Sequence, residues 1–417
     1  MTDNSAMDRL KGIKACLAFD FAFASHQPLS VSQAMSKLKE DESTTVSTSF
    51  RTSNEIRTHI CRLASQNPVE DDFSYGEIKA GTEEKWHYWG VYDGHSGWAT
   101  SKILSGCLAQ RVERHLSRLT DTEVRDTEKI TSALEAAFVE LDNEIMSDGL
   151  DALTSDTPHA EAMCRIAPTN SGSCATLAVL DPVSSVLYVA CAGDSRAVLG
   201  KKNDSDDGFT AIPVSTDQTG SNPTEVARIN AEHPGETPIE GGRVLDCEVT
   251  RSFGDSRWKW PRESILQWQM KFFGMDFKKN YQTPPYITAK PAMETATTAQ
   301  GDFLILASDG FWNHMATNDD AVNCISAWME HQSTTKGHTS GSTEPNDDLT
   351  KASTRGYAYN WKVPREDFVV ENDNPATHLV RNALGGKNTD LFTSMLSLKS
   401  PDSKQARDDI TAIVVFL

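Results

Sequence analysis

The order of strand-like and helix-like segments constrains the fold of this chain most. Residues 98–119 and then 128–146 carry apolar side chains at helical spacing. Two strand-like runs follow within residues 173–193, around an Asp-Pro turn. Because helices and strands come in runs and do not alternate strictly, we predict an α+β fold with layered antiparallel sheets, not a doubly wound parallel sheet.

Shorter elements are predicted farther along the chain. A helix begins at Asn222, which can cap the first turn, and Pro223 suits that turn. Residues 303–308 are typical of a buried strand, residues 320–330 of a helix, and residues 410–417 of a closing strand.

Polar segments divide the chain. Residues 1–55 are mixed in character, and their Ser/Thr-rich stretch DESTTVSTSF is typical of a linker, so we predict a partly irregular N-terminal arm. Residues 56–417 are expected to form a single domain. Within it, residues 331–360 are rich in Ser, Thr, Gly and Asn and are predicted to be a surface insertion.

The charge balance limits the classes of partner that this chain can bind. The chain has 40 basic and 59 acidic residues, a net charge of −19 at pH 7. Nucleic acids and anionic membranes need basic surfaces, so we expect neither as a partner. No apolar run approaches the length of a membrane span, and the eight cysteines show no CxxC pair or zinc spacing. The acidic N-terminus makes a poor transit peptide and favours the cytoplasm.

Carboxylates recur at the ends of predicted strands. The segments WGVYDGHSG, LYVACAGDSRAVLG, FLILASDGFW and RDDITAIVVFL each couple an apolar run to an acid, and an acidic pair precedes the first of them. A single Asp-Gly pair of this kind is usually only a turn. Because the device repeats, we expect these acids to gather at one rim of a sheet. They are Glu70, Asp71, Asp93, Asp194, Asp309 and Asp408.

Clustered carboxylates indicate a metal centre. They repel one another unless a cation neutralises them, and all-oxygen ligands select Mg²⁺ or Mn²⁺ over zinc. Gly94 and Gly310 lack a Cβ, so their backbone can approach an ion closely. Two such ions about 3.5–4 Å apart can clamp an in-line displacement at phosphorus and lower the pKa of a bound water.

The leaving alkoxide of such a reaction needs a proton. His95 follows Asp93 by two residues and is the natural donor. The chemistry alone therefore predicts metal-assisted hydrolysis of a phosphate ester.

Together these motifs resemble the type 2C metal-dependent serine/threonine protein phosphatases. An E-D pair, VYDGHSG, SGSCATLAVL, VACAGDSRAVL, VTRSFGD, LILASDGFW and RDDIT occur in family order over residues 65–417. The resemblance implies a four-layer α/β-β/α sandwich with two central antiparallel sheets and a dinuclear metal centre at one end. It also makes residues 56–417 a single phosphatase domain.

Within the family, the sequence is most similar to the mitochondrial pyruvate dehydrogenase phosphatase branch and its fungal relatives. NPVEDD, AEHP, RSFGDSRWKW, TPPYITAKP and ATHLVRNALGG carry this similarity. It implies an insertion near residues 257–285, and we expect a second near 331–372. The branch implies the mitochondrial matrix, whereas the acidic N-terminus favours the cytoplasm, so we predict an intracellular and preferably cytoplasmic protein.

The resemblance also implies a role for each site residue. His95 would be the general acid, and Asp93 and Asp309 would act in catalysis through the metals. Glu70 would be a water-mediated ligand, and Asp194 would hold a third, weaker metal. The two Mg²⁺ or Mn²⁺ ions would be held by Asp71, Asp93, the carbonyl of Gly94, Asp309 and Asp408.

The sequence departs from the family pattern at three positions. Gln66 stands where many members have the arginine that holds the substrate phosphate, and Asn313 replaces a usual acid near the third metal. Asp409 replaces an asparagine. The pyruvate dehydrogenase phosphatase branch shares the changes at 66 and 409. The phosphate-binding residue is therefore unknown, and we interpret residues 250–254 as structural support.

Three functions stay open. The first is a phosphatase acting on phosphoserine and phosphothreonine in proteins. The second is the same chemistry on a small-molecule phosphate, because the metal centre contacts only the phosphoryl group. The third is a pseudophosphatase that binds without turnover, which the intact Asp93, Asp309 and Asp408 disfavour. A nuclease is disfavoured by the acidic charge.

Overall fold

The computed structural model describes residues 28–48, 55–81, 84–204, 208–335 and 361–417. Antiparallel pairing joins the strands of these residues into two large sheets. Sheet I has the order β1 (Glu42–Thr48), β2 (Glu55–Leu63), β14 (Ile410–Phe416), β13 (Phe303–Ala307), β7 (Arg196–Lys202) and β8 (Phe209–Pro213). Sheet II has the order β12 (Ala292–Thr297), β6 (Val186–Ala192), β5 (Gly172–Asp181), β4 (Glu84–His95) and β3 (Asp72–Ala80), with β11 (Phe253–Gly254) paired to β5.

The two sheets pack face to face and share one apolar core. In β13, Leu304 and Leu306 enter this core between the sheets, whereas Phe303 and Ile305 face the helices outside sheet I. The alternation follows from the two-residue period of a strand, and it explains why this strand is apolar throughout.

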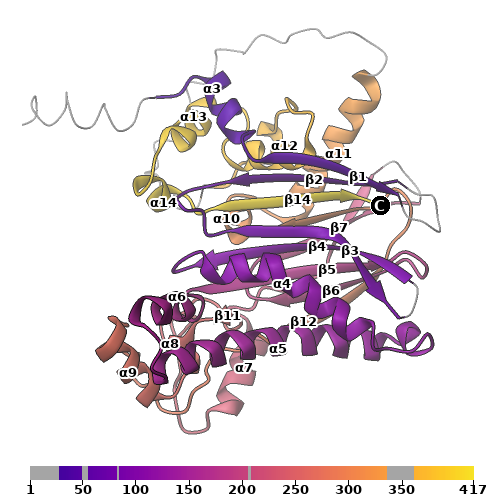
Figure 1. Ribbon diagram of the computed structural model, residues 1–417. Coiled ribbons are helices and arrows are strands. Elements are labelled where there is room, and N and C mark those ends of the chain that lie inside the picture. Colours follow the sequence, from indigo (N-terminus) through magenta and orange to yellow (C-terminus); the bar gives the residue numbers. More distant parts are fainter. Residues whose placement is uncertain (1–27, 49–54, 82–83, 205–207, 336–360) are drawn as a thin grey trace, which may run out of the picture.

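Helices cover the outer face of each sheet, which completes four layers (Figure 1). Sheet II is covered by α4 (Ala99–Leu116) and α5 (Thr127–Thr154), with a short 3-10 helix at Glu123–Arg125. Sheet I is covered by α3 (Val31–Leu38), α10 (Asp309–Trp312), α11 (Asn318–Thr335), α12 (Pro375–Ala383) and α13 (Thr389–Ser397). The predicted α+β sandwich with two central antiparallel sheets is confirmed.

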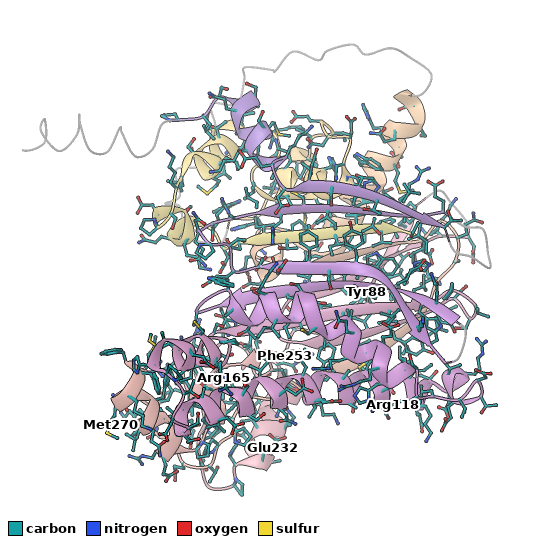
Figure 2. All side chains as sticks on the ribbon, in the orientation of Figure 1. Tyr88, Arg118, Arg165, Glu232, Phe253 and Met270 are labelled. Carbon is teal, nitrogen blue, oxygen red and sulfur yellow. The ribbon has the colours of Figure 1, made fainter. Side chains whose placement is uncertain are left out.

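A smaller helical unit extends from the sheet II side, around an apolar cluster that includes Trp260, Trp268 and Tyr286. Residues 257–285, predicted to be an insertion, supply much of this cluster. Its elements are α6 (His159–Asn170), α7 (Pro223–Glu232), β9 (Ile239–Glu240), β10 (Arg243–Val244), α8 (Ser256–Lys259) and α9 (Arg262–Phe272). Met270 on α9 lies at the periphery of this unit (Figure 2).

Most predicted elements are present. The helices predicted at 98–119 and 128–146 are α4 and α5, and α5 continues to Thr154. The side chain of Asn222 accepts a hydrogen bond from the Thr224 amide and caps α7, as predicted. The division of the chain at residue 55 stays a prediction, and residues 336–360 of the second predicted insertion lie outside the described residues.

The prediction of an irregular linker is wrong for Glu42–Thr48, which forms β1 at the edge of sheet I. Most of its side chains are exposed, so no apolar alternation marks it as a strand. Its backbone pairing with β2 decides its conformation, and this pairing is a tertiary contact that the local sequence does not encode.

None of the helices in the described residues combines the length and the apolar character needed to cross a bilayer.

The core between the sheets should dominate the free energy of unfolding. Leu306 is fully buried there, so Leu306→Ala should lower the stability by about 2–5 kcal/mol through lost burial and a residual cavity. Val46 on β1 is 55% exposed, and Val46→Ala should change stability by no more than about 0.5 kcal/mol. Denaturant unfolding of both variants checks this, and equal losses would contradict the assignment of the core.

Candidate active site

The strand pairing brings the predicted acidic residues to one end of the sandwich. Asp93 lies near the end of β4 and Asp309 follows β13, while Asp71 precedes β3 and Asp408 precedes β14. Because β3–β4 and β13–β14 are antiparallel neighbours, the end of one strand lies beside the start of the next. Asp194, in the turn after β6, completes the rim: carboxylate oxygens of Asp93, Asp194 and Asp309 lie within 4.8 Å of one another.

The first motif is not the simple turn that its Asp-Gly pair predicts. β4 continues to His95, and Asp93 and Gly94 pair with Cys174 and Ser173 of β5. The chain turns only at Ser96 and Gly97, which have positive φ. A Cβ on Gly94 would lie 2.2 Å from the carbonyl oxygen of Glu70, so close backbone approach requires glycine here.

Burial and mutual repulsion make the carboxylate cluster costly. Burial and neighbouring carboxylates raise the pKa of Asp93 and of Asp309 well above the usual range. Burial and Asp409 do the same for the pKa of Asp71. Burial also raises the pKa of Asp194, to about 6. A set of crowded oxygen donors of this kind fits hard divalent cations such as Mg²⁺ or Mn²⁺.

Hydrogen bonds hold the acids in place. The amide of Asp309 donates to Asp93 Oδ2 over 3.1 Å, and Ser195 Oγ donates to the same oxygen over 3.3 Å. Thr411 Oγ1 on β14 donates to Asp71 Oδ2 over 2.8 Å. The carboxylates are therefore oriented by the strands before any ligand binds.

Asp409 is buried beside the site acids and accepts hydrogen bonds from the loop that precedes β3. Its side chain accepts from the Ser65 amide, from Ser65 Oγ at 2.8 Å and from the Glu70 amide at 2.7 Å. These bonds tie the loop that carries Glu70 and Asp71 to the start of β14. Glu70 in turn accepts from the Gly97 amide over 2.6 Å, which fixes the turn after β4.

His95 pairs with an aspartate that we did not predict as a site residue. His95 Nε2 lies 2.8 Å from Oδ2 of Asp255, which is 1% exposed and also accepts from Ser252 Oγ over 2.6 Å. Burial opposes the charge on His95, but Asp255 outweighs it and raises the pKa of His95 to about 9. A Cβ at Gly172 would lie 2.1 Å from His95 Nε2, so the pair needs glycine there.

Residues 250–254 anchor Asp255. Phe253 is fully buried against Phe138 of α5, with ring centroids 5.3 Å apart, where β11 meets the helices (Figure 2). The Gly254 amide donates to buried Asp142 over 2.9 Å. These contacts support the interpretation of the segment as structural.

The sequence model of the family described as Protein phosphatase 2C matches residues 47–355. This chain belongs to the protein phosphatase 2C family. A protein phosphatase 2C homolog of Schizosaccharomyces pombe is 35% identical over 364 residues, which cover 85% of this chain and 79% of the relative.

Two further relatives confirm the predicted similarity to the pyruvate dehydrogenase phosphatase branch. The mitochondrial pyruvate dehydrogenase (acetyl-transferring) phosphatase 1 of Saccharomyces cerevisiae is 30% identical over 396 residues, 87% of this chain and 68% of the relative. Its human counterpart is 31% identical over 329 residues, 73% of this chain and 57% of the relative.

Two residues that contact the predicted site residues, Asp255 and Lys404, were not predicted from the sequence. Asp255 follows a glycine, as Asp194 does, but no apolar strand precedes it, and its partner His95 is 160 residues away. Lys404 bonds to Asp408 from α14 (Asp402–Ala406), and only the RDDIT motif pointed to this region.

The structure shows the contacts of two residues that depart from the family pattern, Asn313 and Gln66. Asn313 Nδ2 donates to Asp309 Oδ2 over 3.3 Å, so an amide stands where the pattern has an acid. Gln66 Nε2 is buried and has no hydrogen-bond partner among the described residues.

The ion pairs that Glu225 forms with Arg228 and Arg251 should make the free energy of unfolding depend on pH. Burial opposes ionisation of Glu225, but hydrogen bonds from Arg251, Arg228 and Thr250 prevail and lower its pKa to about 2. Because the folded pKa lies below the unfolded one, this stabilisation is complete above about pH 4.5 and is lost as the pH falls toward 2.

Glu225→Gln should therefore lower stability by about 3 kcal/mol at pH 7, with the difference from wild type shrinking below pH 4.5. Glu232→Gln, on the half-exposed end of the same helix, should cost less than about 0.5 kcal/mol. Urea unfolding between pH 3 and 7 measures both. A difference for Glu225→Gln that does not change with pH would contradict the assignment.

Proposed function

We propose that this protein is a Mg²⁺- or Mn²⁺-dependent phosphatase that dephosphorylates phosphoserine and phosphothreonine in proteins. The observation that carries the proposal is the convergence of partly buried carboxylates at the rim that also holds the His95–Asp255 pair. Membership of the protein phosphatase 2C family supports a phosphoprotein substrate.

The residues present fit the metals that the family implies. Asp71, Asp93, Asp309, Asp408 and the Gly94 carbonyl would hold two ions, and Asp194 would serve a third. When bound, the ions supply an activated water and neutralise charge on the phosphoryl group. Asp93 and Asp309 would be central ligands, because their carboxylate oxygens lie within 4.8 Å of each other and of Asp194.

His95 would donate a proton to the leaving serine or threonine oxygen. Its side chain is 32% exposed, so it can reach a substrate, and the acceptor Asp255 holds its ring and keeps it protonated. Asp255 is 1% exposed and acts through His95, which makes it a positioning residue.

Relatives suggest the class of substrate. Those of budding yeast and human are named as mitochondrial phosphatases of pyruvate dehydrogenase, a protein substrate. By analogy we propose a phosphorylated metabolic enzyme as the substrate of this chain. The compartment stays a prediction, although the relatives of budding yeast and human are named as mitochondrial.

Loss of one central ligand tests the metal mechanism. Asp309→Asn should lower Mn²⁺-dependent phosphate release from a phosphothreonine peptide by at least about a hundredfold, because even groups that only support a ligand cost up to that much. It should also abolish the rise in melting temperature that Mn²⁺ gives the wild type. Asp390→Asn, at an exposed site on α13, should change neither.

The wild type should lose activity with chelator and regain it with Mn²⁺ or Mg²⁺. Turnover of an aryl phosphate without turnover of the peptide would support the small-molecule alternative instead. A folded wild type that binds Mn²⁺ and hydrolyses neither substrate would contradict the proposal and favour the pseudophosphatase that binds without turnover.

Asp255→Asn tests the proton donor. The amide keeps the shape of the side chain but not the charge that orients and protonates His95, so kcat on the phosphothreonine peptide should fall about tenfold to a hundredfold, within the range of general acid catalysis. An aryl phosphate should be affected less, because its phenolate leaves without a proton. Equal losses on both substrates would contradict a role in proton donation and indicate a purely structural one.

A further inference from the structure

A lysine on an element outside the two sheets contacts two of the predicted site acids. Lys404 lies on α14, between α13 and β14 in the chain, and its side chain is 33% exposed. Its Nζ bonds to Asp408 Oδ1 and lies 3.5 Å from Glu70 Oε2. It therefore bridges the two acids at the edge of the site that solvent and substrate can reach.

Other nearby cations of the described residues are already committed to structural partners. Arg407 is buried and donates to the carbonyl oxygens of Ala64 and Asp408. The side chain of Arg62 pairs with the carboxylates of Asp41 and Asp72, which lie outside the predicted ligand set, and donates to the backbone carbonyl of Asp71. Lys404 differs because both of its partners are side-chain carboxylates of the predicted site.

The helix α14, which carries Lys404, is attached to the residue that precedes Gln66. Ser403 Oγ donates to the carbonyl oxygen of Ser65, the residue before Gln66. The Gln66 amide is buried and carries no positive charge, so it cannot attract a phosphate dianion as a cation does. The helix α14 thus brings the ammonium group of Lys404 toward the loop in which Gln66 carries no charge.

We propose that Lys404 binds the phosphoryl group of the substrate and supplies the cation that Gln66 does not. The inference rests on the proposed phosphatase function and assigns its missing phosphate-binding residue. An ammonium group on a flexible stem has three donors, so it can contact a phosphoryl oxygen while it stays near Glu70. Divalent ions at Asp408 would compete for the carboxylate that Lys404 contacts and would leave its donors to the phosphate.

Inorganic phosphate is the probe, with the full chain and saturating Mn²⁺. Lys404→Met should weaken phosphate binding, measured calorimetrically and as competitive inhibition, by about tenfold to a hundredfold, as expected for a lost hydrogen bond to a charged group. The KM for a phosphothreonine peptide should rise by a similar factor. Mn²⁺ affinity should be unchanged or higher, because a competing cation is gone.

Two further variants control for charge and folding. Lys404→Arg should keep phosphate affinity within about threefold of wild type, because the guanidinium also binds phosphate. Lys399→Met removes an exposed cation close by in sequence and should leave phosphate binding unchanged. Melting temperatures of all variants establish that each is folded.

Phosphate affinity within twofold of wild type in Lys404→Met would overturn the inference. So would a fall in Mn²⁺ affinity that accounts for the whole loss of phosphate binding, because Lys404 would then only organise the carboxylates. The two proposals can fail separately. Lys404-dependent phosphate binding without any turnover contradicts only the proposed function, and turnover insensitive to Lys404→Met contradicts only the assignment of Lys404.

Discussion

Repulsion among buried carboxylates is the constraint around which this structure is built. Asp71, Asp93 and Asp309 lie close together at one rim, where burial and their neighbours raise the pKa of each. Left without a cation, such a cluster would favour protonation or local opening. The protein holds it through strands that are anchored in the core between the sheets and through backbone and hydroxyl donors aimed at individual oxygens. The stability of the sandwich thus offsets the cost of the site.

The pair of His95 and Asp255 depends on packing contacts outside the carboxylate rim. Asp255 reaches His95 because Phe253 and Gly254 are fixed against α5, and Glu225 on α7 binds the side chains of Thr250 and Arg251. The small helical unit that contains α7 and α8 is therefore connected to His95 through the segment that carries Asp255. Changes in this unit can reach His95 without touching the carboxylates.

In the proposed phosphate site, the cation comes from a helix and not from the loop around Gln66. The loop around Gln66 supplies neutral groups, and the helix α14, bonded to that loop at Ser65, carries the cation. A charge needs only to lie within contact distance of the phosphoryl group, and the strand or helix that carries it can change.

Periodicity and turn chemistry in the sequence determined the α+β class with antiparallel sheets, the strands β5, β6 and β13, and the capping of α7 by Asn222, whereas the four-layer sandwich was implied by the family resemblance. The repeated acids at strand ends also predicted one rim, because antiparallel neighbours place ends and starts together. Only the tertiary structure decided that Glu42–Thr48 is a strand, that Asp93 lies within β4, and that Asp255 and Lys404 join the site. The physical reason is the range of the interactions. Helical periods, caps and turns act over a few residues, whereas edge pairing and ion pairs join groups that are distant in sequence and leave no local pattern to read.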